Sequence, residues 1–154
     1  MKNQRGFTLI ELAIVTSIIV LLLGFITINL VSSQQGASLT SVEEILLADL
    51  KQQQLKAMIG DTEGREASDQ YGVHFDQTKY TLFHGAYLIG ETSNSVINLD
   101  SNMQFNSPDY DVIFSKLSGE IPVARNIELQ DNTNFKFKRI HLNTLGVITQ
   151  IESL

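Results

Sequence analysis

The chain has 154 residues, with 11 Lys and Arg against 17 Asp and Glu, and a formal net charge of −6. This length allows one compact domain and little more. The acidic balance argues against a general nucleic-acid binder, because such proteins need surplus cations to neutralise phosphates. The absence of cysteine excludes disulfides, thiol nucleophiles and cysteine-based metal sites.

Hydrophobic residues are concentrated near the N-terminus, in the block 7–31. No ionisable side chain occurs between Leu12 and Val42. A bilayer core needs about 20 apolar helical residues, whereas a secretory signal peptide has a core of only about 7–15. The block therefore predicts a single membrane helix over residues 7–31. Lys2 and Arg5 precede it, so we expect a cytoplasmic N-terminus, with the rest of the chain on the far side.

Glu11 is the one ionisable residue inside this apolar block. A carboxylate deep in a bilayer is costly, by about 3 kcal/mol, so it needs a partner or an interfacial position. The residue types alone allow a carboxylate at the level of the cytoplasmic headgroups, close to Arg5. The alternative is that Glu11 has a functional role, for which the neighbouring residues in the sequence are the evidence.

Glu11 and the residues before it read GFTLIE, at residues 6–11, behind a short basic leader. They resemble the type III signal of type IV pilins and pseudopilins. The resemblance implies that a prepilin peptidase removes the leader, residues 1–6, by cutting between Gly6 and Phe7, and then N-methylates Phe7. It also implies an assembly role for Glu11, about 6 Å along the helix from the new amine. A neighbouring subunit shifted by about one turn could place its amine beside this carboxylate, and such staggered contacts build filaments.

Apolar residues at helical spacing continue beyond the membrane block, at Leu39, Val42, Leu46 and Leu50. The pattern predicts an amphipathic continuation over residues 32–59, in one near-continuous helix with a weak point at Gly24 or Gly36. The alternative is a helix that restarts at Ser41, which could form a capping box with Glu44.

After residue 60 the apolar period changes to two, which predicts a β-rich globular domain over residues 60–154. The expected fold class is α+β, with the long helix packed on an antiparallel β-sheet. The first two strands should pair with Tyr71 opposite His84, and His74 opposite Thr81. The expected strands are 71–75, 80–84, 86–89, 96–99, 103–105, 112–117, 126–130, 135–142 and 147–151.

Part of this domain resembles the GspH/FimT-type minor pseudopilins, in the segments 71–75, 112–121 and 139–148. In that branch two strands each end in a turn glycine, and Gly119 and Gly146 occupy those places here. The C-terminal disulfide loop of the major pilins is missing. The resemblance implies a minor subunit of a type II secretion pseudopilus or a type IV pilus-like filament, which would serve protein secretion, pilus biogenesis or DNA uptake.

The residues that could carry chemistry do not form a catalytic or metal-binding motif. The three histidines lack a nucleophile motif, and the expected strand pairing puts His74 and His84 on opposite faces. The Asx-rich run 131–134 is typical of a turn, because the calcium-loop ligand pattern and its closing Glu are absent. We therefore expect no enzymatic activity, no cofactor and no metal.

Aromatic and basic residues alternate over residues 135–139, in the letters FKFKR. The pattern favours a strand with a buried Phe face and a solvated basic face. The alternative is DNA contact by Lys136, Lys138 and Arg139, in a DNA-receptor domain. A membrane-anchored ligand-binding domain is a further alternative.

The expected partners are a prepilin peptidase, other pilin-like subunits through the N-terminal helix, and the lipid of the bacterial inner membrane. The C-terminal domain is expected to be periplasmic or extracellular.

Overall fold

The computed structural model describes the backbone of residues 9–153, and the side chains of residues 9–22 and 39–153. The chain divides into two compact units, residues 1–38 and residues 39–154. Helix α1 (Leu9–Ile59) contributes to both units, and all the strands belong to the second.

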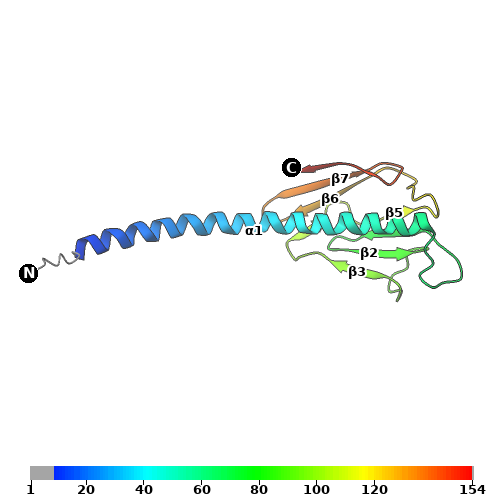
Figure 1. Cartoon of the computed structure of the whole chain (residues 1–154), viewed down its shortest axis with the longest axis horizontal. Helices are drawn as coiled ribbons and strands as arrows, with labels where there is room; N and C mark the ends of the chain where they lie inside the picture. Colours follow the sequence, from blue (N-terminus) through cyan, green and yellow to red (C-terminus); the bar gives the residue numbers. More distant parts are fainter. Residues whose placement is uncertain (1–8, 154) are drawn as a thin grey trace, which may run out of the picture. The chain divides into compact units, whose positions relative to one another are not determined.

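Helix α1 is continuous over its described length (Figure 1). Gly24 and Gly36 are both helical, and the chain is already helical before Ser41, so the alternative of a helix that restarts there is wrong. The helix ends in a Schellman motif: the Gly60 N–H donates to the Ala57 carbonyl, and the Asp61 N–H donates to the Lys56 carbonyl. Gly60 has φ +66°, a conformation that glycine adopts without a steric penalty.

Within the described residues, the strands form two four-stranded antiparallel sheets. Sheet A has the order β3-β2-β1-β5 and sheet B the order β4-β6-β7-β8. The strands are β1 (Tyr71–Phe75), β2 (Lys79–His84), β3 (Ser95–Asn98), β4 (Met103–Phe105), β5 (Tyr110–Phe114), β6 (Arg125–Asp131), β7 (Lys136–Leu142) and β8 (Ile148–Ser153). The expected register of the first hairpin is confirmed, with Tyr71 opposite His84 and His74 opposite Thr81.

Two expected strands differ from the structure. Residues 86–89 are a loop, although their apolar letters mimic a buried strand. Tyr87 in this loop stacks on the His74 ring at 3.8 Å, so the loop covers the outer face of sheet A instead of extending it. The strand expected over 112–117 ends at Phe114, because Leu117 and Gly119 both have positive φ values near 70°.

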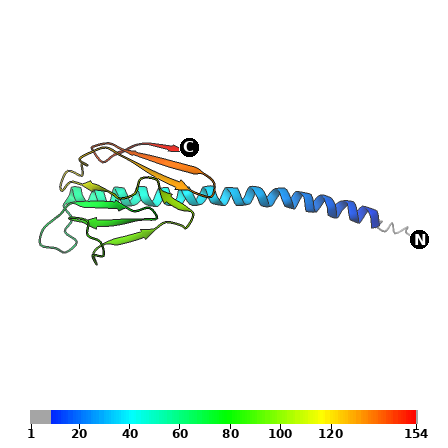
Figure 2. The ribbon, with the colours of Figure 1, turned by 180° about the vertical axis from the view of Figure 1, so that it is seen from behind.

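The core of the second unit lies between the second half of α1 and the inner faces of both sheets, which flank this half of the helix (Figures 1 and 2). The helix contributes Leu39, Leu46, Leu50 and Ala57. Sheet A contributes Tyr71, Val73, Phe75, Tyr80, Val112 and Phe114, and sheet B contributes Met103, Phe105, Ile127, Leu129, Ile140 and Leu142. An N-terminal helix packed on antiparallel sheets confirms the expected α+β fold.

Candidate processing and assembly site

The first described part of α1, residues 9–22, exposes every side chain that it carries. Its large aliphatic side chains are between 48% and 86% exposed, and they occupy all sides of the helix: Leu9, Ile10, Leu12, Ile14, Val15, Ile18, Ile19, Val20, Leu21 and Leu22. A surface helix of a soluble domain has a polar face, and residues 9–22 of α1 have none. An apolar surface of this extent is a contact surface for lipid or for other apolar helices.

The two hydroxyl side chains in this part of α1 bond to the helix itself. The Thr16 hydroxyl donates to the carbonyls of Leu12 and Ala13 at 2.9 and 3.0 Å, and the Ser17 hydroxyl donates to the Ile14 carbonyl at 2.8 Å. Such local bonds satisfy a hydroxyl group in a medium that offers no water. Neither residue therefore prevents the helix from entering an apolar environment.

Glu11 is the one ionisable residue between positions 9 and 22, and its side chain is exposed on this apolar surface. The predicted cleavage site, between Gly6 and Phe7, lies outside the described residues. The predicted membrane helix over residues 7–31 also extends beyond the part whose side chains are described. Within the described part of the chain, no helix has the length and hydropathy of a membrane span.

The basic residues of strand β7 lie in different surroundings. Lys138 lies on the inner face of sheet B, where its Nζ is 2.9 Å from the Glu43 carboxylate on α1, and the two side chains are only 18% and 8% exposed. The predicted solvated basic face was therefore wrong, because this face packs on the helix and also holds Ile140. Phe135 precedes the strand in a turn and is 76% exposed.

Arg139 lies on the opposite, outer face of sheet B. It is paired with Glu128 on β6 at 2.7 Å and with Glu152 on β8 at 3.3 Å, and both residues are directly opposite it in the sheet. The hydrogen bond from Arg139 lowers the pKa of Glu128 and outweighs the opposing effect of burial. Lys136 is exposed, whereas Lys138 and Arg139 are neutralised on opposite faces, so the three do not form one basic surface.

Asp131 closes the turn that its Asx-rich neighbourhood predicts. Its carboxylate accepts hydrogen bonds from the Thr133 N–H at 2.8 Å, the Asn134 amide at 2.7 Å and the Asn102 amide at 3.2 Å. Burial alone would raise the pKa of Asp131, but these hydrogen bonds together lower it. No group of three or more His, Asp and Glu residues able to hold a metal ion occurs among the described positions.

Gln54 is a positioning residue that the sequence does not single out. Its amide donates to the Gly119 carbonyl at 3.0 Å and to the Leu145 carbonyl at 2.9 Å. The two turn glycines, Gly119 and Gly146, have φ values of +70° and +71°. A Cβ at Gly146 would lie 2.5 Å from the Gln54 amide nitrogen and 2.7 Å from the Gly119 carbonyl. Both turns are therefore packed against the C-terminal turns of α1, where no side chain would fit.

The comparisons with known proteins agree with the N-terminal part of this description. The prokaryotic N-terminal methylation motif matches residues 1–27. No curated protein and no solved structure matches the chain. Proteins that carry this motif are pilin-type, and their family is structural rather than catalytic. This motif, at the start of a long helix that packs on antiparallel sheets, supports a type IV pilin-like protein that is processed by a prepilin peptidase.

Proposed function

We propose that this protein is a minor pilin or pseudopilin of the GspH/FimT type. It is cut between Gly6 and Phe7, is N-methylated at Phe7, and joins a short filament of a type II secretion system or a type IV pilus-like machine. Before assembly the helix over residues 7–31 holds it in the bacterial inner membrane, with the globular domain on the far side. The observation that carries this proposal is the exposed Glu11 carboxylate on an apolar helix, inside the N-terminal methylation motif.

The physical role of Glu11 follows from its surroundings. Cleavage after Gly6 would create a cationic amine at Phe7, one helical turn before Glu11. In an apolar filament core, a carboxylate and an amine from neighbouring subunits attract far more strongly than they do in water. This contact would fix the axial shift between subunits, and the aliphatic side chains of residues 9–22 would supply the contact area.

The role of a minor subunit is supported by the globular domain. The chain has no cysteine and so lacks the disulfide loop of the major pilins. Gly119 and Gly146 both occupy left-handed turns that follow strands β5 and β7, as in the GspH/FimT pattern. A DNA receptor is less well supported, because Lys138 and Arg139 are already paired with carboxylates of the same chain.

Replacement of Glu11 tests this function. We expect Glu11→Gln and Glu11→Leu to enter the membrane and lose the leader like the parent, yet to be absent from filaments, because neither side chain carries the negative charge that forms an ion pair with a cationic amine. The measurement is filament recovery and subunit crosslinking in cells that carry each variant. Glu44→Gln is the matched control, because it removes an exposed carboxylate from the second half of the same helix.

Assembly of the Glu11→Leu variant at the level of the parent would contradict the proposal. The carboxylate would then be only an interfacial residue, and the helix would be a plain anchor for a ligand-binding domain.

A further inference from the structure

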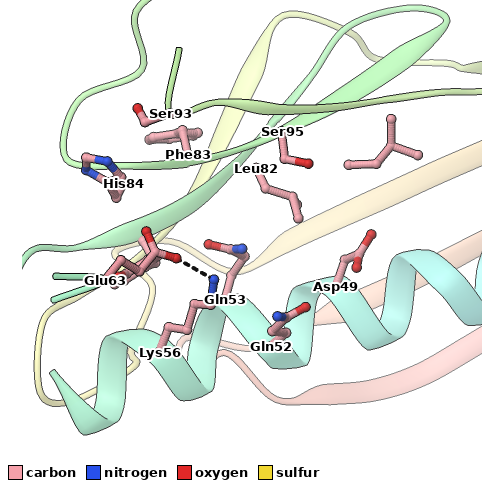
Figure 3. Close-up of a pocket in the computed structure, with 12 residues that line it drawn as sticks. Asp49, Gln52, Gln53, Lys56, Glu63, Leu82, Phe83, His84, Ser93 and Ser95 are labelled. Atoms are coloured by element: carbon pink, nitrogen blue, oxygen red, sulfur yellow. Dashed lines mark hydrogen bonds and ion pairs between the residues drawn. The ribbon is translucent and has the colours of Figure 1, made fainter. Parts of the chain in front are cut away.

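A cavity of about 340 Å³ lies between the second half of α1 and strands β2 and β3 (Figure 3). It is distinct from the exposed apolar helix, because every residue that lines it belongs to the second unit. Its lining combines polar side chains of the helix with apolar side chains of the sheet, and the residues that matter below are Asp49, Gln53, Lys56, Leu82, Ser95 and Ile97.

Gln53 is the first sign that the cavity receives a ligand. Its side chain is only 3% exposed, and its Oε1 has no hydrogen-bond partner among the described residues. Figure 3 shows the Gln53 amide extending from the helix into the space toward β2. Buried amide oxygens are almost always hydrogen-bonded, so this acceptor indicates a donor that comes from outside the chain.

Asp49 lies one turn earlier on the same face of α1 and also lines the cavity. It accepts a hydrogen bond from the neutral Tyr80 hydroxyl at 2.6 Å, and within the described part of the chain no cation pairs with it. The nearby Lys56 is already paired with Glu63 (dashed line in Figure 3). The cavity therefore holds one carboxylate without a cation, beside an acceptor without a donor. The complementary group is a cation with several N–H donors.

The walls of the cavity indicate how such a cation arrives. Leu82 and Ile97 are apolar and can enclose a methylene stem. Strand β3 is the edge of sheet A, and its alternate residues Ser95 and Ile97 line the cavity. An extended segment that pairs with the open edge of β3 would point every second side chain to this same face.

We propose that this cavity binds the guanidinium group of an arginine side chain, carried by an extended segment of a partner protein that pairs with the edge of β3. The planar guanidinium has enough N–H donors to reach both the Asp49 carboxylate and the Gln53 carbonyl. Its stem lies between Leu82 and Ile97. This contact is independent of filament assembly through residues 7–31.

The test uses the full processed chain in detergent micelles and an end-capped pentapeptide of Thr and Val with one central Arg. The control peptide has citrulline in place of Arg, which keeps the shape and removes the charge. Binding is followed by titration of backbone amide signals in NMR spectra. We expect the citrulline peptide to bind at least about tenfold more weakly, and the signals of β3 to shift on binding of the Arg peptide. Equal binding of the two peptides would overturn the proposal.

Two variants connect the binding to the cavity. Asp49→Asn keeps an acceptor for the Tyr80 hydroxyl but removes the charge, and we expect it to weaken binding by about tenfold. Glu44→Gln removes an exposed carboxylate outside the cavity and should bind like the parent. The amide spectrum of each variant shows that it is folded. Unchanged binding by Asp49→Asn would overturn the proposal.

A third probe separates the two possible sources of a guanidinium. N-acetyl-arginine methylamide carries the same side chain but cannot pair along β3, so we expect it to bind more weakly than the pentapeptide. Equal affinity of the two probes would contradict the partner strand, because the cavity would then recognise a small guanidinium compound.

Discussion

Two stretches of the same helix differ in what their side chains contact. Residues 9–22 expose large aliphatic side chains on every side of α1 and bury none. Residues 39–59 instead form a two-faced helix, with Leu39, Leu46, Leu50 and Ala57 buried against the sheets and polar residues such as Lys51 exposed. The helical backbone is the same, so the difference comes from the side-chain pattern alone.

This difference separates the contacts that function needs from the contacts that folding needs. The first stretch can bury its surface only against lipid or other subunits. The second stretch is stabilised within the chain, where even its buried charge is paired, as Glu43 is with Lys138. Substitutions in the second unit should therefore lower the free energy of unfolding without changing leader removal. Glu11 variants should leave both the free energy of unfolding and leader removal unchanged and lose only filament assembly.

Gly146→Ala should have the largest effect on the folded unit. The added Cβ would approach the Gln54 amide and the Gly119 carbonyl to 2.5 and 2.7 Å, at a φ of +71°. We expect the free energy of unfolding to fall by about 3 kcal/mol, measured by urea denaturation with circular dichroism. Gly90→Ala is the matched control: its φ is +81° but no atom lies within 4 Å, so only the backbone penalty of about 1 kcal/mol applies. Equal losses in the two variants would contradict the packing of this turn on α1.

Glu43→Gln should have the next largest effect, because it leaves the Lys138 ammonium without its carboxylate in a nearly buried position. We expect a loss of about 2 kcal/mol in unfolding free energy, less than for a fully buried pair because Lys138 keeps some contact with solvent. Glu63→Gln breaks the more exposed pair with Lys56 and should change it by less than about 1 kcal/mol. The double variant Glu43→Leu with Lys138→Met should recover part of the loss, since two packed apolar side chains need no charge partner. No difference between the two single variants would show that the Glu43–Lys138 pair contributes no more than a surface pair.

The smallest effect concerns acid stability. Hydrogen bonds hold the pKa of Asp131 below its ordinary value of 3.8 in the folded chain. Its contribution to stability is therefore complete above the unfolded pKa and is lost as the pH falls through the lower, folded pKa. We expect Asp131→Asn to reduce stability at neutral pH and to make the fall in unfolding free energy below about pH 4 less steep. Urea denaturation over a pH series measures this, and parallel pH profiles for variant and parent would contradict it.

Local periodicity predicted much of this fold. The spacing of Leu39, Leu46 and Leu50 predicted the second half of α1, and alternation predicted the first hairpin with its register. The turn glycines Gly119 and Gly146 were also identified correctly, because their positive φ depends only on a short stretch of chain. The processing motif was recognisable for the same reason, since its letters are contiguous.

Contacts between distant parts of the chain could not be predicted in this way. Alternation placed Lys136 and Lys138 on one face of the strand. It could not show that this face points inward, where Lys138 pairs with Glu43 on the helix. Residues 86–89 are as apolar as a buried strand, yet they form a loop that extends no sheet. Tyr87 in this loop stacks on His74. Gln53 and Gln54 do not stand out in the helical sequence pattern. The burial of Gln53 and the hydrogen bonds of Gln54 arise from the loops and strands that pack beside them.

Mass spectrometry of the mature N-terminus tests the central claim most directly. We predict that the protein isolated from membranes begins at Phe7 and carries one methyl group on its amine, and that it keeps Met1 when the prepilin peptidase is deleted. An intact Met1 in the parent cells, or a cut near residue 35, would contradict the account of this chain as a processed pilin-like subunit.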